Sequence, residues 1–453
     1  MEAIEKLARF IVETGFEKMP AEAATIVKHR LLDTLGAALA GSKEPVAKVI
    51  TSFVKKLGGE PVAGVIGGRF RTSSPNAALA NGTIGHAIDY DDSGIAQGHT
   101  AVIMLPTIFA LAEELGNSGK EAIEAYVLGI ETCHRISLAM PHMHLKGWHP
   151  SSVFGTMGAA TAAAKLLKLN VEQTIMALGI AGSQAAGIVH NFGTMTKPFH
   201  AGNAARSGVM AAMLAKDGFT ASKNILDGDA GYPRTFYGQK VDTSVIAENL
   251  GQPFAIISPS SYLKLHPCAG GTLRPTDATL YLAEKYDIKP DEVESVEVGI
   301  SPVHNRYTFY TDPSTALEGK FSIQFVVAAA ITDRQVGLAQ FTNERVNSPE
   351  IKDLMKRVKK GVHPHWTEEW GKKDDYPALV TVKLKNGKEY SHSVEKPKGH
   401  PDVPLSWDEL LVKYRDCAGR ALKDSDVERS IEILADLEKL NDLKELMEIV
   451  TGR

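Results

Sequence analysis

Residues 151–168 read SSVFGTMGAATAAAKLLK, a run in which glycine and alanine stand where larger apolar side chains usually fill a core. Alanine is the strongest helix former, so the run predicts one long helix. The spacing between packed helices depends on the side chains at the contact, and small ones allow a close approach. We therefore expect this helix to lie inside a compact, all-helical core.

Helical segments of the same kind surround this run in the first 265 residues. Most of them begin at a polar residue or a proline and end near glycine or asparagine, the usual signals for helix starts and stops. The expected helices cover residues 20–41, 44–58, 100–116, 119–139 and 171–189.

The pattern changes after residue 265. Val296, Val298 and Ile300 alternate with other residues at a period of two, which predicts a strand. A second strand over 379–384 is followed by Asn386-Gly387, the strongest short-range hairpin signal, and by a third strand over 390–394. Helical patterns lie between the strands, at residues 272–287, 320–332 and 348–360.

The last part of the chain is helical again. Four prolines and glycines between residues 397 and 404 read as a linker, and Ser406 is a cap ahead of further helical segments. The predicted fold is therefore mostly α, with a smaller α+β domain. A large all-helical domain is built from both chain ends, 1–265 and 402–453, and residues 266–401 form the smaller α+β domain.

Composition excludes several classes of protein. The net charge of −4 offers no basic surface for nucleic acid. The N-terminus lacks the regions of a signal peptide, and glycine or charge interrupts each apolar run before membrane-spanning length. The three cysteines, Cys133, Cys268 and Cys417, are isolated, unlike zinc, redox or iron–sulfur ligands. We expect a cytoplasmic protein with neither a nucleic-acid nor a membrane partner.

Acidic residues cluster in residues 86–93, which read HAIDYDDS, and His99 follows. So many carboxylates repel one another unless a cation or a polar site compensates. A divalent metal could bind their oxygens. One carboxyl could be a proton donor, as in the D-x-D-D motif of some terpene cyclases, or Asp89 could orient a histidine or a substrate. A solvated loop that caps the next helix is the alternative.

Two further segments carry groups suited to anions or proton transfer. His149 precedes a predicted helix N-terminus, where the helix dipole favours an anion, although a histidine that satisfies a loop carbonyl is the alternative. Lys197 lies in a predicted polar loop over 192–203, directly before Pro198, so its backbone should be extended or turning. Its ammonium would suit a carboxylate partner or a proton donor, or else face solvent.

A third segment falls at the predicted domain boundary. Lys264, His266 and Cys268 lie next to Gly270-Gly271, at a place in the chain where small-molecule clefts often form. A plain glycine-rich hinge is the alternative. The P-loop, the G-x-G-x-x-G loop, H-E-x-x-H and the G-x-S-x-G elbow are all absent from the sequence, so nucleotide-driven chemistry has no support.

These segments together resemble the MmgE/PrpD family, over nearly the whole chain. The matching blocks are His29–Gly36, Asn81–Gly82, Ala87–Asp92, Gly147–Pro150, Gly193–Lys197 and His200–Gly202. The resemblance implies a large all-α domain with an α+β lid, a homodimer, and an active site in the cleft that needs neither a cofactor nor a metal. It also implies that the substrate is a small polycarboxylate.

By position, the resemblance implies that the active-site residues are Asp89, Ser93, His99, His149 and Lys197. His99 and His149 would be the acid/base pair, because histidine titrates near neutral pH. Lys197 would clamp a carboxylate or donate a second proton, and Asp89 would orient or tune one histidine.

The reaction stays open between several members of the class. All pass through a carbanion or enolate beside a carboxylate, and a dehydratase of the 2-methylcitrate type is slightly preferred. By the resemblance, decarboxylase-like members have a Pro-x-His motif at the position where this chain has Pro267-Cys268-Ala269. The missing histidine lowers the expectation of a cis-aconitate decarboxylase. The alternatives are an epimerase of an iminodisuccinate-like acid and, more remotely, a terpene-type cyclase or a non-catalytic helical binding protein.

Lys264, His266 and Cys268, at the predicted domain boundary, are expected to contact the substrate.

Overall fold

The structure, a computed structural model, describes residues 2–372 and 377–452, and the chain forms two compact units. The first comprises Met1–Val189, Met195–Ser261 and Ser406–Arg453, and the second comprises His190–Thr194 and Tyr262–Leu405. The boundaries expected from sequence were 265/266 and 401/402, whereas the units change at 261/262 and 405/406.

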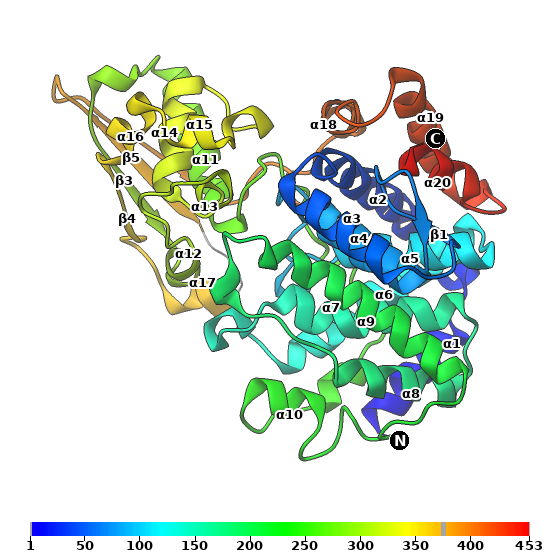
Figure 1. The fold of residues 1–453 in the computed structure, drawn as a ribbon. Coiled ribbons are helices and arrows are strands. Elements are labelled where there is room, and N and C mark those ends of the chain that lie inside the picture. Colours follow the sequence, from blue (N-terminus) through cyan, green and yellow to red (C-terminus); the bar gives the residue numbers. More distant parts are fainter. Residues whose placement is uncertain (1, 373–376, 453) are drawn as a thin grey trace. The chain divides into compact units, whose positions relative to one another are not determined.

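The first unit is helical apart from one short antiparallel pair of strands, β1 (Ala63–Gly64) and β2 (Arg71–Thr72). Its helices are α1 (Ala3–Glu13), α2 (Ala21–Gly41), α3 (Pro45–Leu57), α4 (Ser74–Gly85), α5 (Ala101–Leu115), α6 (Gly119–Ala139), α7 (Pro150–Leu166), α8 (Val171–Gly182), α9 (Thr196–Lys216), α10 (Tyr232–Tyr237), α18 (Trp407–Ala418), α19 (Asp424–Ala435) and α20 (Lys444–Thr451). Figure 1 shows α4, α7 and α9 running through its centre.

Small residues set the close packing of these central helices. A Cβ atom added at Gly202 of α9 would lie 2.2 Å from the carbonyl oxygen of Leu79 on α4. One added at Gly158 of α7 would lie 2.7 Å from the carbonyl oxygen of Gly129 on α6. No side chain fits at either distance, so glycine is required where these helices meet. The small residues of 151–168 thus mark the interior of the unit, as the sequence predicts.

The C-terminal helices belong to this first unit. Helix α18 packs along α2, and Lys413 of α18 lies 2.6 Å from the carboxylate of Asp33 on α2. Nζ of Lys413 also donates to the carbonyl oxygen of Tyr90 (2.7 Å). Figure 1 shows α18 (orange) beside α2 (blue), which are far apart in sequence. The end of the chain therefore supports the loop that follows α4.

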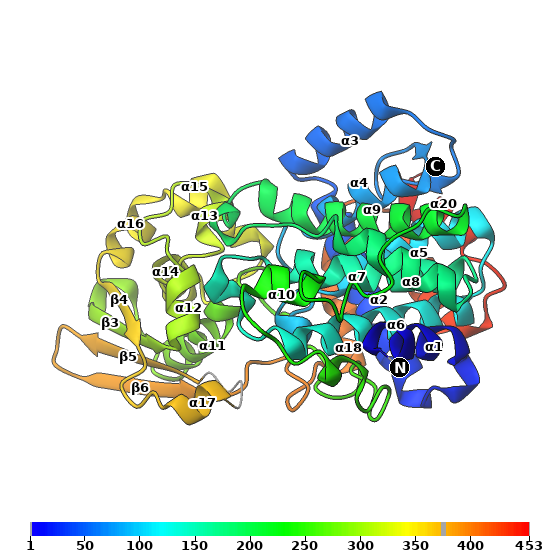
Figure 2. The ribbon, with the colours of Figure 1, turned by 90° about the horizontal axis from the view of Figure 1, so that it is seen from below.

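The second unit is a four-stranded sheet with helices on one face. Its strands are β3 (Val293–Ile300), β4 (Val358–Val362), β5 (Ala378–Leu384) and β6 (Glu389–Val394), in the spatial order β4-β3-β5-β6. β3 pairs parallel to β4 and antiparallel to β5, and β5 and β6 form the hairpin predicted around Gly387, whose φ is 81°. Figure 2 shows this hairpin extending from the helices.

Helices α11 and α14 cover the sheet and complete the core of the second unit. Its helices are α11 (Gly270–Lys285), α12 (Pro302–Tyr307), α13 (Ala316–Gly319), α14 (Ile323–Asp333), α15 (Asn343–Val346), α16 (Pro349–Met355) and α17 (Glu368–Lys372). Along β5 the buried side chains are Ala378, Val380, Val382 and Leu384, at the period of two expected for a sheet with one covered face.

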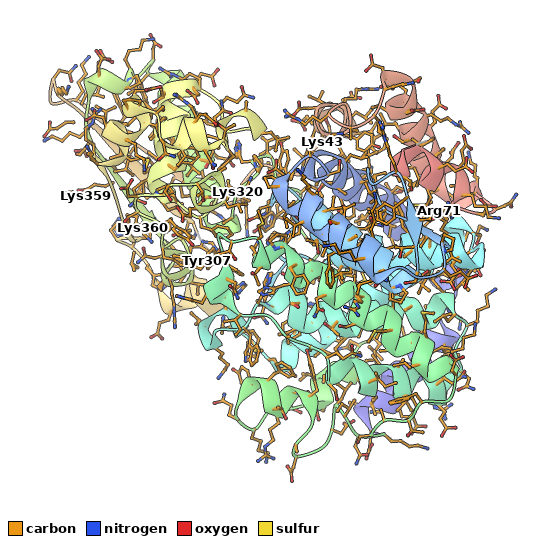
Figure 3. The ribbon with its side chains drawn as sticks, viewed as in Figure 1. Lys43, Arg71, Tyr307, Lys320, Lys359 and Lys360 are labelled. Carbon is orange, nitrogen blue, oxygen red and sulfur yellow. The ribbon has the colours of Figure 1, made fainter. Side chains whose placement is uncertain are left out.

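Two sequence predictions about this topology are wrong. The pattern over 348–360 predicted a helix, but α16 ends at Met355 and residues 358–362 form β4. Lys359 and Lys360 are neighbours on that strand (Figure 3), and Nζ of Lys360 donates to the carbonyl oxygens of Asn305 and Thr308. The helix expected over 171–189 ends at Gly182.

The prediction of a loop over 192–203 is also wrong for the second half of that segment. Helix α9 begins at Thr196, so Lys197 and Pro198 lie in its first turn. Proline is tolerated there because the first N–H groups of a helix have no partner within it. Lys197 is therefore buried on a rigid element, with 4% of its surface exposed. Within the described residues, none of the helices is both long and apolar enough to span a bilayer.

Candidate active site

A buried loop between α4 and α5 carries the acidic cluster. We call residues 86–99 the acidic loop. Three of its non-glycine residues, Asp89, Ala96 and Gln97, have positive φ angles of 54°, 50° and 59°, so the chain is tightly folded. Both ends of the Gln97 side chain are held, since Nε2 donates to the carbonyl oxygen of Met140 (2.9 Å) and Oε1 accepts from the N–H of Met143 (2.8 Å).

The acidic loop also packs against the start of α7. The N–H of His99 donates to Oγ of Ser151 (2.9 Å). A Cβ atom at Gly98 would lie 2.4 Å from that same oxygen, so only glycine allows the loop to come this close. This contact brings the acidic loop to the helix N-terminus where His149 is the capping residue.

Asp91 joins two histidines. Nδ1 of His86 lies 2.8 Å from Oδ1 of Asp91, and Nδ1 of His99 lies 2.9 Å from Oδ2. Although burial favours the neutral acid, these imidazoles hold the pKa of Asp91 well below its usual value. Asp91 is thus a carboxylate, and each Nδ1 carries the donated proton.

The tautomer of His99 follows from these contacts. Its Nδ1 is also 2.6 Å from the carbonyl oxygen of Asp92, a second acceptor. A proton must therefore lie on Nδ1, which leaves Nε2 as the basic nitrogen of the neutral ring. Nε2 faces Oδ1 of Asp89 at 3.8 Å.

Asp89 and Lys197 form a buried ion pair beside His99. Oδ2 of Asp89 lies 3.0 Å from Nζ of Lys197, and both side chains are about 95% covered. A buried cation of this kind can bind a substrate carboxylate or the negative charge that develops in a reaction. The lysine is rigid because it lies on α9.

His149 contacts a histidine on α9. Its Nδ1 lies 3.1 Å from Nδ1 of His200, and the ring of His86 stacks at 6.2 Å between centroids. Burial, followed by the charge of Lys197, lowers the pKa of His149 well below its usual value. Burial also lowers the pKa of His200, to about 4. Both rings are therefore neutral near pH 7.

Asp92 has structural partners. It accepts from the N–H of Ala101, from Oγ1 of Thr100 and from Oγ of Ser261, at 3.0, 3.2 and 2.9 Å. Burial raises its pKa. This carboxylate therefore fixes the start of α5, and the three acids of the motif have three different environments.

The first unit thus brings together Asp89, His99, His149 and Lys197, as four of the predicted site residues. Ser93 lies in the same acidic loop and is 8% exposed. Lys264, His266 and Cys268 are in the second unit and are buried there.

The side chains around Lys264, His266 and Cys268 pack tightly and use most of their polar groups. The ring of His266 bonds at Nε2 to Oδ1 of Asp277 and at Nδ1 to the carbonyl oxygen of Val336, both at 2.9 Å. Nζ of Lys320 (Figure 3) donates to the carbonyl oxygen of Pro267 (2.8 Å). Cys268 is part of the apolar core of its unit. That they contact substrate stays a prediction.

The acidic loop also contains donor atoms suited to a metal. Ligand atoms of His86, Asp89, Asp91 and His99 lie within 4.8 Å of one another. The carboxylate oxygens of Asp91 already accept from two imidazoles, and Asp89 is paired with Lys197. The carboxylate oxygens that a divalent ion would need are therefore bonded to imidazole N–H groups and to the ammonium of Lys197.

Sequence reasoning overlooked two members of this cluster. Asp91, rather than Asp89, accepts the proton of His99 Nδ1. His200 was given no role, although Lys197 and His200 are three residues apart. Residues at that spacing share one face of a helix, so the signal was available once α9 was extended to residue 196.

Comparisons with known proteins agree with this architecture. The MmgE/PrpD N-terminal domain matches residues 5–244, and the MmgE/PrpD C-terminal domain matches residues 266–439. A cis-aconitate decarboxylase from Mus musculus is 30% identical over 446 residues, which is 94% of this chain and 88% of that protein. One from Homo sapiens is 29% identical over 94% and 89% of the two chains. One from Aspergillus terreus is 28% identical over 96% and 93%.

Both domain matches, and relatives that align over nearly the entire chain, confirm the resemblance seen in the sequence. The mostly helical fold with a smaller α+β unit is confirmed as well. The chain belongs to the MmgE/PrpD family and is a lyase of that type.

Proposed function

We propose that the chain is a lyase for a small tricarboxylic acid that uses its own side chains for proton transfer, and that decarboxylation of cis-aconitate is its first candidate reaction. The relatives named above are cis-aconitate decarboxylases and align over more than nine-tenths of this chain. The observation that carries the proposal is the contact of His99 with Asp91, because it sets a basic nitrogen next to a buried lysine.

The chemistry follows from that arrangement. When a carboxylate leaves as carbon dioxide, the electron pair of the broken carbon–carbon bond stays on the substrate and must be neutralised by a proton. A histidine that has taken a proton is the donor suited to neutral pH. The ammonium of Lys197 stabilises the negative charge before that proton arrives.

His99 and His149 are the proton-transfer groups in this scheme. His99 presents Nε2 towards Asp89, and the ring of His86 contacts both the ring of His99 and the ring of His149. Asp89 keeps Lys197 in place until a substrate carboxylate competes for it. Ser93, in the same acidic loop, is proposed to contact a remaining polar group of the substrate.

Dehydration of 2-methylcitrate is the second candidate. The sequence Pro267-Cys268-Ala269 lacks the histidine of the decarboxylase-like Pro-x-His, which favours this reaction. Here one group removes a proton from carbon and another protonates the departing hydroxyl, so the same two histidines suffice. A homodimer stays a prediction for either reaction.

The test uses the whole chain after treatment with a chelator. Cis-aconitate, 2-methylcitrate and iminodisuccinate are offered separately and followed by ¹H NMR, with carbon dioxide measured in parallel. Release of carbon dioxide from cis-aconitate is the expected result. A new alkene signal from 2-methylcitrate alone would select the dehydratase. Exchange of the α-proton of iminodisuccinate, without loss of water or carbon dioxide, would identify an epimerase and contradict both the decarboxylase and the dehydratase assignments.

A further inference from the structure

Two buried imidazoles on different helices meet nitrogen to nitrogen. Nδ1 of His149, at the start of α7, lies 3.1 Å from Nδ1 of His200 on α9. The residues are 1% and 7% exposed, so water reaches neither ring freely. Two bare nitrogens would repel at this distance, and two N–H groups would collide. One Nδ1 therefore donates and the other accepts.

The main chain around the pair holds both rings in place. The N–H of His149 donates to the carbonyl oxygen of Gly187 (3.0 Å), which fixes the residue before α7. The carbonyl oxygen of His200 accepts from Oγ of Ser152 (3.1 Å), so α9 is tied to α7 at the same level. The contact between the rings is therefore a feature of the helix packing.

This contact decides what the other nitrogen of His149 can do. In a neutral imidazole, only one of the two nitrogens carries a proton. If Nδ1 of His149 donates, its Nε2 is a base. If Nδ1 accepts from His200, Nε2 carries the proton and is an acid.

We propose that His200 is a positioning residue that sets the tautomer of His149, and that a single Nδ1 proton shared by the two rings switches His149 between base and acid. The inference rests on the proposed function, in which His149 transfers protons. The complete exchange, in which Nε2 both takes and gives a proton, applies to dehydration, in which a proton is removed from carbon; in decarboxylation His149 only gives a proton, which it first takes from solvent.

The proton balance of the switch is simple. When Nε2 of His149 takes a proton from the substrate, the ring becomes cationic, and its Nδ1 proton crosses to Nδ1 of His200. His149 is then neutral with a proton on Nε2, and the charge resides on His200. When Nε2 gives its proton to the substrate, the Nδ1 proton returns, and both rings regain their first state. In dehydration no other reactant is consumed; in decarboxylation the proton that Nε2 gives to the substrate comes from solvent water.

The direct test is ¹⁵N NMR of the ligand-free full-length chain labelled at histidine. Opposite tautomers for His149 and His200, with scalar coupling between their Nδ1 nuclei across the hydrogen bond, are expected. The assignments come from loss of signals in His149→Gln and His200→Asn. Nε2–H tautomers on both rings, without coupling, would overturn the proposal.

A matched control separates tautomer from packing. Ser152→Ala removes the bond to the backbone of His200 but leaves both rings, so the coupling should persist. His200→Asn keeps a polar amide near Nδ1 that cannot relay a proton, and the coupling should vanish. If Ser152→Ala removes the coupling as well, a shared proton set by the rings themselves is excluded.

The kinetic readout is the split between kcat and KM. For His200→Asn we expect kcat to fall about 10- to 100-fold, with KM within about threefold, since general acid–base catalysis contributes on the order of 10²–10⁴. An unchanged kcat would contradict the proposal. A wild-type chain that turns over no tricarboxylate would contradict the proposed function instead, and the NMR result would still decide the tautomer.

Discussion

Oδ2 of Asp91 lies 2.9 Å from Nδ1 of His99, and both side chains are buried. A carboxylate in this position fixes the ring, keeps the proton on Nδ1, and stabilises the imidazolium that forms when Nε2 takes a proton. Asp91 makes the equivalent contact to His86 with its other oxygen. The carboxylate therefore determines the protonation of two histidines at once.

Asp91→Asn should lower kcat by about 10²- to 10⁴-fold, because an amide can present its NH₂ to Nδ1 and so select the wrong tautomer. The matched control is Asp92→Asn, next in sequence, whose side chain holds Ala101 and Ser261 instead. Steady-state kinetics on both variants distinguishes them. Equal losses of kcat would mean that the acidic loop as a whole, and not Asp91, is responsible.

Lys197→Met should raise KM for a tricarboxylate about 10- to 100-fold, the size expected when a charge-assisted hydrogen bond is lost. Lys165→Met is the control, because Lys165 binds the main-chain oxygen of Thr14, outside the acidic loop. A fall in kcat with KM unchanged would identify Lys197 as a proton donor, not a carboxylate clamp.

Lys413→Met should destabilise the protein by about 3–5 kcal/mol, because Asp33 would remain buried without its cation. Adding Asp33→Asn should recover much of the loss. Urea unfolding of the two variants measures this. The exposed pair of Arg9 with Glu5 is the comparison, and Arg9→Gln should change stability by at most about 1 kcal/mol. A similar small effect for Lys413→Met would contradict the buried pair.

Acid should weaken the fold through His200. Its folded-state pKa is lowered from 6.5 to about 4, so between those values the unfolded chain binds more protons, and stability falls as the pH falls. His200→Asn should flatten the dependence of unfolding free energy on pH by about 1.4 kcal/mol per unit in this window. Urea titrations at several pH values test it. Parallel curves for wild type and variant would show that His200 is not buried as a neutral ring.

Chelation should leave activity unchanged, and added Mg²⁺ or Mn²⁺ should not increase it. Asp91 already accepts two imidazole protons and Asp89 is paired with Lys197, so the oxygens that would bind an ion are in use. Activity that is lost on dialysis with a chelator and returns with a divalent ion would identify the acidic loop as a metal site.

The helical fold was readable because its signals are local. Helix caps and small residues predicted α6 at 119–139, and Asn386-Gly387 predicted the β5–β6 hairpin. Strand β4 could not be predicted, because Val358 to Val362 include two lysines and a glycine. The strand forms by pairing with β3, which is more than fifty residues away in the sequence. A strand whose stability comes from a distant partner leaves little pattern of its own.

The residues of the candidate site could be predicted in part, but the contacts between them could not. The acidic loop and His149 were visible as residue types and through the family resemblance. The contact of Asp91 with His99 depends on the tight folding of the acidic loop, and the contact of His149 with His200 depends on how α7 and α9 cross. Spacing in the sequence reveals neither. Lys197 was placed in a loop because the pre-proline rule was applied to a residue that lies in a first helical turn.

The most direct test of the account follows deuterium in D₂O with the wild-type chain and with His99→Asn. The account predicts that wild type converts cis-aconitate to carbon dioxide and a dicarboxylate carrying one solvent-derived deuterium, and that kcat falls by at least about 10² in His99→Asn. A product without solvent deuterium, or an unchanged kcat in His99→Asn, would contradict proton transfer by the histidine that Asp91 holds.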